Sequence, residues 1–517
     1  MGDILIGVDA GTSVIKAVAF DRDGRQLAVA ARRNSFDTPM PGHVEQDMRR
    51  TFADVVAVIR ELGDEIPNLA RRVIALGVTA QGDGTWLIDG AGDPVGGGLL
   101  WLDSRASDLV AEHLRSEAYP QHYALTGAGL NACMSSVQIA WMQAHQPERL
   151  AKAATTLHCK DWLYFRLTGI RATDPSEASF TFGNFRTRRY EPSILEGMGI
   201  ADQARLLPPI VDGTTTTHPL TAEAAAATGL PAGLPVALGY IDVVCAALGG
   251  GLYDPEVSAG VTVLGTTGMH MRLALTPEAV RLNPDRSGYT MAFPVPGASS
   301  QMQSNMAATL NIDWLLDVAM EAASIGGVTL DRGALLAGMD AAVFAARPAS
   351  ALYHPYIVEA GERGPFLDRN ARAQFSGLSQ ATGYAGLMRA IYEGLSLAAR
   401  DCYVAMGEIP ADVRVVGGAA RSQAVRRILA SVLGANVRSV DREETGAAGA
   451  VMIASVALGL HADMAACVKA WVTPALGEAV TPDAELRRVY DGAFPIYRSI
   501  REAMPGPWAA LASLRRG

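Results

Sequence analysis

The sequence predicts an α/β protein made of two similar halves with a cleft between them. At 517 residues, the chain exceeds the roughly 250 to 300 residues at which a single hydrophobic core stops growing. A β-rich run at 4–20, ILIGVDAGTS followed by VIKAVAF, passes through a glycine-containing turn, and the pattern returns at 256–275 as EVSAGVTVLGTTGMHMRLAL. Two such units about 250 residues apart indicate a duplicated fold.

The first half opens with three strands and continues with a helix and a fourth strand. The strands are expected at about 4–9, 14–20 and 25–31, the amphipathic helix near 47–62 and the next strand at 73–79. Further helices are expected near 106–116, 135–144 and 159–167. The second half is then expected to repeat strand, hairpin and helices.

The boundary between the halves is expected near 250–256, in GGGLYDP, where glycines and Pro255 break a helix. This places an N-terminal domain at 1–253 and a C-terminal domain at 254–517. We find no low-complexity linker, so the hinge is expected to consist of packed elements. The apolar run 445–460 is too short and too rich in Gly and Ala to span a bilayer of about 30 Å, and it is interpreted as a buried helix.

The first glycine turn has the residues of a phosphate site. Gly11 lets the backbone approach a ligand, and successive N–H groups around a turn bind anions. Thr12 and Ser13 add hydroxyl donors, and Lys16 on the next strand can supply a counter-charge. Asp9, at the end of the first strand, can hold Mg²⁺ directly or through water. The alternative is an ordinary β-hairpin with a polar turn.

The second glycine turn, Gly265-Thr266-Thr267, offers backbone and hydroxyl donors of the same kind. Two such turns suggest halves that hold phosphates from opposite sides. His270, beside this turn, can reach a ligand or serve simply as a strand residue, and its alternation with apolar residues favours the strand.

A third glycine segment follows a short apolar strand in VRVVGGAARSQAVRRILASVL at 413–433. Gly417 and Gly418 would let a flat nucleobase or ribose lie close to the backbone, and an amphipathic helix is expected to begin near Ser422. A plain strand-to-helix turn is the alternative.

Asp242 is the only ionisable side chain in ALGYIDVVCAALGGGL, at 237–252, apart from the phenol of Tyr240. An Asp at a helix start is commonly an N-cap. Between two phosphate turns, however, a carboxylate can accept the proton of a hydroxyl as its oxygen attacks a γ-phosphate.

Polar residues also follow two strands within 76–105. Gln81 and Asp83 come after the first of these strands, and Trp101 and Asp103 come after the second. Amide, carboxylate and indole groups suit a polyhydroxylated ligand, whose hydroxyls need donors and acceptors and whose C–H face packs on a ring. Asp103 and Arg105 can equally form a structural ion pair.

Together these segments resemble the FGGY family of carbohydrate kinases, within the actin and hexokinase superfamily. The resemblance extends to KDWLYFRLTG at 160–169, TDPSEAS at 173–179, PYIVEAGERGPFLDRNARAQFSGL at 355–378, YEGLSLAARD at 392–401 and ETGAAGA at 444–450. It implies two ribonuclease-H-like domains of the actin/hexokinase type, to which the β-β-β-α-β order of the first half corresponds. It also implies transfer of the γ-phosphoryl group of MgATP to a hydroxyl of a sugar or polyol.

The resemblance assigns roles to residues of this sequence. Asp242 would be the general base, and Asp9 and Asp242 would lie at the Mg²⁺ ion. The residues for ATP and its phosphates would be Thr12, Ser13, Lys16, Gly265, Thr266, Thr267, Gly417, Gly418 and Ser422. The residues for the acceptor would be Gln81, Asp83, Trp101, Asp103 and Asp242.

Departures from the pattern of glycerol kinases narrow the acceptor. Those kinases typically have Gln-Arg-Glu where this chain has Gln81-Gly82-Asp83, Gln in place of Val243, and Tyr in place of Cys133. Glycerol is therefore not the expected substrate. The segment AQGDGTW at 80–86 most resembles kinases that act on erythritol, and the AQGKG pattern of L-xylulose kinases is the nearest alternative.

Composition excludes several other classes of protein. A net charge of -9 and a pI near 5.6 argue against binding nucleic acid through a broad basic surface. Five widely separated cysteines, none in a C-x-x-C spacing, suggest reduced thiols in the cytoplasm, and neither a secretory signal nor a membrane partner is expected. We expect a small-molecule sugar or polyol as partner and leave room for a homodimer.

Two other functions agree less well with the sequence. A non-catalytic nucleotide and sugar sensor would not need the base Asp242. A dinucleotide-dependent dehydrogenase would need a G-x-G-x-x-G after the first strand, which the sequence lacks, and a P-loop is missing from it too.

Overall fold

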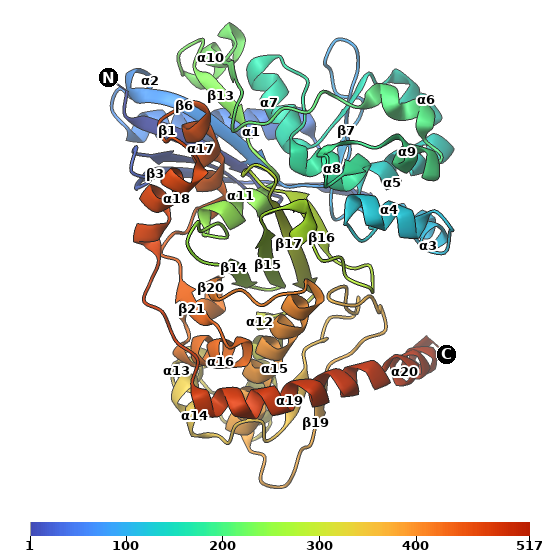
Figure 1. The fold of residues 1–517 in the computed structure, drawn as a ribbon, viewed down its shortest axis with the longest axis vertical. Helices are drawn as coiled ribbons and strands as arrows, with labels where there is room; N and C mark the ends of the chain where they lie inside the picture. Colours follow the sequence, from blue (N-terminus) through green and yellow to red (C-terminus); the bar gives the residue numbers. More distant parts are fainter. Residues whose placement is uncertain (1, 517) are drawn as a thin grey trace.

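The computed structural model describes residues 2–516 and has two six-stranded mixed sheets, one in each half of the chain (Figure 1). The first sheet has the order β12 (Thr217–Pro219), β13 (Pro235–Leu238), β6 (Val73–Ala80), β1 (Ile4–Ala10), β2 (Val14–Phe20) and β3 (Gln26–Arg33). The second has the order β16 (Tyr289–Ala292), β17 (Ser299–Asn305), β15 (Gly268–Ala274), β14 (Ala259–Leu264), β20 (Asp412–Val416) and β21 (Asn436–Ser439).

The two sheets have the same core topology. In the first, β1, β2 and β3 are antiparallel neighbours, while β6 and β13 run parallel to β1. In the second, β14, β15 and β17 are antiparallel neighbours, while β20 and β21 run parallel to β14. The duplicated α/β fold predicted from the two glycine turns is therefore confirmed.

The elements expected in the first half are present. The helices are α1 (Met48–Glu65), α3 (Ser107–His113), α5 (Ser135–His145) and α7 (Cys159–Thr168). Helix α1 begins where the Asp47 side chain accepts the N–H groups of Arg49 and Arg50. An additional hairpin of β4 (Asp37–Met40) and β5 (His43–Gln46), not predicted from the sequence, lies between β3 and α1.

The remaining helices complete the layers around the sheets. In the first half they are α2 (Leu69–Arg72), α4 (Tyr119–Thr126), α6 (Pro147–Lys152), α8 (Pro175–Phe182), α9 (Pro192–Gly197), α10 (Ala222–Thr228) and α11 (Asp242–Gly249). In the second half they are α12 (Thr309–Ile325), α13 (Arg332–Ala337), α14 (Met339–Ala345), α15 (Tyr384–Ala405), α16 (Gln423–Leu433), α17 (Thr445–Ala457), α18 (Met464–Trp471), α19 (Ala484–Ala503) and α20 (Pro505–Arg516). Within residues 2–516, none of the helices combines the length and apolar character needed to cross a bilayer.

Three apolar layers hold the sheets. Alternate residues of β1 point to opposite faces, so Ile4, Ile6 and Val8 join α1 and α7 in one core while Leu5 joins α11 and α17 in another. That second core also contains residues of the second sheet, such as Val261. A third core packs the other face of the second sheet against α15 and α16.

Helix α17, the predicted buried helix, returns from the second half to cover the first sheet. A Cβ atom on Gly7 or Gly77 would collide with the α17 carbonyl of Ala447 or Ala450, respectively, so glycine permits this close approach. In Figure 1, α17 lies beside β1 and β6. Helix α11 ends at Gly249, with Gly250 as its C-cap, as expected for the helix that the glycines break. The domain boundary at 253 stays a prediction.

Candidate active site

The first glycine turn joins β1 to β2 and places Asp9 opposite Lys16 in the hairpin. Lys16 Nζ forms an ion pair with Glu444 at 2.8 Å, so the second half provides the partner of the predicted phosphate-binding lysine. Burial raises the pKa of Asp9 to about 6; Lys16 opposes that shift and Glu444 adds to it. Ser13 is exposed in the turn.

A hydrogen-bond chain joins this turn to the predicted acceptor residues. The Trp101 indole donates to Thr12 Oγ1 at 2.7 Å, and the Thr12 hydroxyl donates to Gln81 Oε1 at 2.6 Å. The Gln81 amide in turn donates to Gln46 Oε1 at 2.7 Å, and the Gln46 amide donates to Asn34 Oδ1 at 2.6 Å. Three of the predicted residues are therefore brought together, although Trp101 remains 40% exposed.

Gln46 and Asn34 were missed by the sequence analysis. Asn34 closes the chain by donating to the carbonyl of Gly11 at 2.8 Å, so the network returns to the first turn. Asn34 lies before the unexpected hairpin of β4 and β5, and Gln46 is the last residue of β5, so neither belongs to a glycine turn that would have marked it.

Asp242 is the first residue of α11, and its Oδ1 accepts the N–H of Val243 at 2.7 Å. The N-cap position of α11 is Ile241. Asp242 is therefore not an ordinary N-cap residue, which was the alternative to a role as general base. Burial raises the pKa of Asp242 well above its usual value, and the nearby charges of Asp9, Glu177 and Asp83 raise it further. A carboxyl group with a high proton affinity thus lies near Asp9 and Asp83.

Asp83 lies in a strained turn, with a positive φ of 55°. Its N–H donates to Glu177 Oε1 at 3.2 Å, and the Cys133 thiol lies 3.6 Å from its Oδ2. Its Oδ1 is buried and has no hydrogen-bond partner among residues 2–516. Burial raises the pKa of Asp83 to about 6, while His158, Cys133 and Arg363 lower it.

Asp103 forms its hydrogen bonds and its ion pair with other partners than the residues described above. Its Oδ2 accepts the N–H of Val44 at 2.7 Å, and Arg105 forms an ion pair with it at 2.8 Å with both side chains fully buried. Arg105 also pairs with Glu45 at 2.8 Å. The ion pair considered from sequence is therefore present, and contact of Asp103 with an acceptor stays a prediction.

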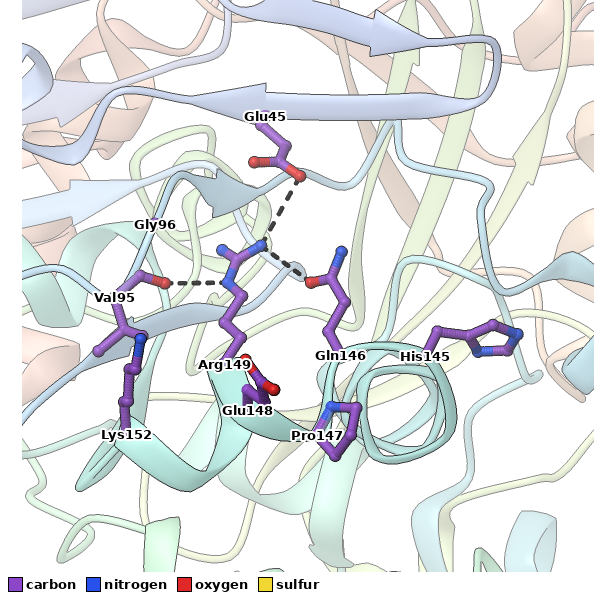
Figure 2. Close-up of a pocket in the computed structure, with 9 residues that line it drawn as sticks. All are labelled: Glu45, Val95, Gly96, His145, Gln146, Pro147, Glu148, Arg149 and Lys152. Carbon is purple, nitrogen blue, oxygen red and sulfur yellow. Dashed lines mark hydrogen bonds and ion pairs between the residues drawn. The ribbon is translucent and has the colours of Figure 1, made fainter.

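Glu45 also belongs to a surface hollow of about 740 Å³. Figure 2 shows Arg149 there, donating to the Val95 carbonyl at 2.9 Å and to Gln146 Oε1 at 3.3 Å. None of the predicted site residues lines this hollow. Its size alone therefore does not make it the catalytic site.

The second glycine turn and the third glycine segment lie side by side. Gly417 has a φ of 98°, and a Cβ atom there would lie 2.6 Å from the carbonyl oxygen of Leu264, directly before Gly265. Gly418 opens a short 3₁₀ helix, Gly418–Arg421, and has free space at its Cβ position. Glycine is therefore required at 417, where the two segments meet.

The second turn presents its threonines to solvent. Thr266 and Thr267 are both exposed, while the carbonyl oxygens of Gly265 and Thr266 accept the N–H groups of Thr309 and Ala308 at 2.9 and 2.8 Å. His270 is buried in β15 and contacts Asn305 at 3.0 Å, which confirms it as a strand residue.

Ser422 caps α16 by accepting the N–H of Val425 at 3.1 Å. Its hydroxyl donates to Asp340 Oδ1 at 2.6 Å, and Asp340 Oδ2 accepts the N–H of Gln423 at 2.8 Å. The helix therefore begins where the sequence predicted. Asp340, 82 residues earlier, carries no local signal that would have identified it.

A buried ionic cluster lies behind Asp83 and was also missed. Lys160 Nζ contacts both Asp161 and Asp174 at 2.7 Å, and all three side chains are fully buried. His158 bridges Asp161 at 3.0 Å and Glu177 at 3.5 Å. The cluster thus links α7 to Glu177 of α8, which holds the backbone of Asp83.

The chain matches known families along most of its length. Residues 4–249 match the model for the FGGY family of carbohydrate kinases, N-terminal domain, and residues 260–458 match that for the C-terminal domain. The erythritol kinase of Brucella abortus is 49% identical over 512 residues, covering 99% of this chain and 98% of that protein. The L-xylulose/3-keto-L-gulonate kinase of Escherichia coli is 28% identical over 510 residues, covering 97% of each.

The fold agrees with these matches. The crystal structure of gluconate kinase from Lactobacillus acidophilus superposes with a TM-score of 0.88 at 21% identity, covering 98% of this chain and 99% of that one. The two matching domain models and the related fold confirm the resemblance found in the sequence. This chain belongs to the FGGY family of carbohydrate kinases.

Proposed function

We propose that this enzyme transfers the γ-phosphoryl group of ATP to a hydroxyl of a small polyol, with erythritol the favoured substrate. The observation that carries the proposal is Asp242, a carboxyl group of raised pKa at the start of α11, influenced by both Asp9 and Asp83. The 49% identity to an erythritol kinase supports the choice of acceptor.

Asp242 would accept the proton of the attacking hydroxyl. Phosphoryl transfer has a loose transition state, so the proton moves late and catalysis depends mainly on positioning and charge neutralisation. Closure of the two halves would exclude water and bring the hydroxyl into line with the γ-phosphate.

Asp9 and Asp242 would hold the Mg²⁺ ion that arrives with ATP. Within residues 2–516, no group of three or more His, Cys, Asp or Glu side chains is arranged to hold a metal. Mg²⁺ commonly uses only one or two carboxylates together with phosphate oxygens and water, which matches this pair. When bound, the ion would offset the charge of the phosphates.

The glycine segments would bind the nucleotide. Thr12, Ser13 and Lys16 would contact phosphates from one side, and Gly265, Thr266 and Thr267 from the other. The exposure of Ser13, Thr266 and Thr267 supports this role, because their hydroxyls are accessible. Gly417, Gly418 and Ser422 would lie against the nucleoside.

Gln81, Asp83 and Trp101 would contact the acceptor. The unpartnered Oδ1 of Asp83 is a ready acceptor for a hydroxyl, and the exposed Trp101 ring can pack on C–H groups. Asp103 would also contact the acceptor, with its carboxylate oriented by the buried pair with Arg105. The 28% identity to an L-xylulose kinase favours L-xylulose or another ketopentose as the second candidate.

The test is ADP release from MgATP with erythritol, threitol, the pentitols, L-xylulose, D-xylulose, D-ribulose and glycerol. We expect erythritol to give the strongest response and Asp242→Asn to lower kcat by about 10² to 10⁴. Asp463→Asn, which changes an N-cap Asp of α18, is the matched control and should keep normal turnover. Wild-type turnover by correctly folded Asp242→Asn would remove Asp242 as the base.

Location and assembly are further parts of the proposal. The five cysteines are free and four of them are buried, which supports a reducing cytoplasm. A homodimer is the assembly to test, and light scattering of the purified chain would measure its mass in solution.

A further inference from the structure

The loop that contains Arg363 is fixed to the end of β17. Glu362 Oε1 accepts the N–H groups of Met306 and Arg363, both at 2.9 Å. The carbonyl of Gly364 accepts the Asn305 amide at 2.7 Å, and a Cβ atom on Gly364 would lie 2.6 Å from the carbonyl oxygen of Ser304. The backbone of Arg363 is therefore held firmly by the second half.

The Arg363 side chain, in contrast, has unused donors. Its Nε is buried without a hydrogen-bond partner among residues 2–516, and no carboxylate in that range lies within 4.0 Å to form an ion pair with it. An unpaired buried donor is unfavourable, most of all on a charged group. A ligand with oxygen atoms would relieve that cost.

The charge of Arg363 acts on groups of both halves of the molecule. The guanidinium charge lowers the pKa values of Asp83, Cys133 and Tyr289, against the larger raising effect of burial. Tyr289 links the halves here, since its hydroxyl accepts the Asn131 amide at 2.7 Å and its ring packs on Phe180 at 5.7 Å.

Two unsatisfied groups of opposite charge thus lie on different halves, at a place where the halves are in contact. Asn131, two residues before the Cys133 that contacts Asp83, donates to Tyr289, and Tyr289 pairs with β17, whose end holds the Arg363 loop. Asp83 Oδ1 can only accept hydrogen bonds when ionised, and Arg363 can only donate them. A hydroxyl group can do both, so neighbouring hydroxyls of one molecule would satisfy both residues at once. Such a ligand is a compact polyol with adjacent hydroxyl groups.

We propose that Arg363 is an acceptor-binding residue, donating to hydroxyl oxygens of the polyol whose hydrogens Asp83 accepts. This rests on the proposed function and deepens it, because it assigns part of the acceptor site to the second half. The enzyme would then recognise the polyol fully only when both halves contact it.

The test compares Arg363→Gln with Arg369→Gln, an exposed arginine of the same loop. We expect Arg363→Gln to raise the acceptor KM by about tenfold or more while the KM for MgATP stays within about twofold. Arg369→Gln should leave both constants unchanged, and Arg363→Lys, which keeps the charge without the planar donors, should be intermediate.

Two outcomes would overturn the proposal. One is an unchanged acceptor KM in Arg363→Gln. The other is an equal rise in both KM values with a lowered Tm, which would make Arg363 a structural latch between the halves.

Isothermal titration of erythritol separates this proposal from the proposed function. If the wild-type chain binds erythritol without phosphorylating it, and Arg363→Gln loses that binding, the kinase assignment for erythritol fails while the role of Arg363 holds. If the wild-type chain binds no polyol of the panel, the role of Arg363 as a polyol ligand is wrong.

Discussion

At the scale of single residues, burial raises the pKa values of the carboxyl groups in the candidate active site. Asp9, Asp83 and Asp242 all have raised pKa values because their carboxylates are removed from water, and Asp242 is raised further by the charges of the other two. Neither Asp83 nor Asp242 forms an ion pair within 4.0 Å in the described part of the chain. A buried carboxylate without an ion-pair partner lowers the stability of the unliganded protein. Carboxylates with pKa values perturbed in this way are typical of functional sites.

The pKa of Asp83 predicts how acceptor binding depends on pH. Because the value is raised to about 6, the carboxyl group becomes protonated as the pH falls through that range and stops accepting two hydroxyl hydrogens. At saturating MgATP, we expect the acceptor KM to rise roughly fourfold between about pH 7.5 and about pH 5.5. The measurement is steady-state kinetics over that range.

Asp83→Asn is the control for this pH dependence. Its acceptor KM should be high at every pH and should no longer change between the two values. A variant that kept the wild-type profile would show that another group titrates.

At the scale of elements, glycines decide where α17 can lie. Gly446, in the first turn of α17, lies against the Asp9 carboxylate, and a Cβ atom there would collide with Asp9 Oδ2. The helix therefore fixes the position of the predicted metal ligand although it comes from the other half. The sequence ETGAAGA carries this contact.

Gly446→Ala is expected to damage catalysis more than folding. Alanine favours the helix, and the short Asp9 side chain can move aside, so the free energy of unfolding should change little. The displaced carboxylate should lower kcat/KM for MgATP by about tenfold or more.

Gly492→Ala is the matched control for Gly446→Ala, because it also replaces a helical glycine with alanine. Gly492 lies in α19 with nothing within 4 Å of its Cβ position, so alanine there should stabilise the protein by roughly 0.5 to 1 kcal/mol and leave kinetics unchanged. Thermal unfolding and MgATP titrations of both variants measure the difference. Normal kinetics in Gly446→Ala would refute the positioning role.

Local signals explain which parts of the site were predictable from sequence. β-branched runs and glycine turns mark the hairpins at 4–20 and 256–275 directly. Gln46 and Asp340 could not be found in this way, because their partners Gln81 and Ser422 are distant in the chain. Their roles depend on tertiary contacts that leave no local pattern.

At the scale of the whole molecule, α11 and α17 form the layer shared by both sheets. The helices cross closely, since a Cβ atom on Gly249 would collide with the carbonyl of Thr445, and one on Gly449 with that of Cys245. The expectation of packed elements between the halves agrees with this contact. The packing of α17 on the first sheet was not predicted. The apolar composition of this helix indicates that it is buried but does not indicate which sheet it packs against.

Gly449→Ala is therefore expected to destabilise the entire protein. Its methyl group would meet backbone atoms, which cannot rotate away, so the helices must separate at a cost of roughly 1 to 3 kcal/mol. Urea unfolding followed by fluorescence should give a lower midpoint, with Gly492→Ala as the reference. A midpoint equal to that of the wild type would contradict the close crossing.

The position of α17 also bears on how the chain folds as the ribosome makes it. Its residues 445–457 are translated long after the first sheet, whose apolar side includes Leu5 and Val18. Until those late residues emerge, the part of that side that α17 covers stays exposed in the nascent chain. The N-terminal half therefore keeps apolar surface exposed until the C-terminal half has been made, a condition that promotes aggregation during synthesis.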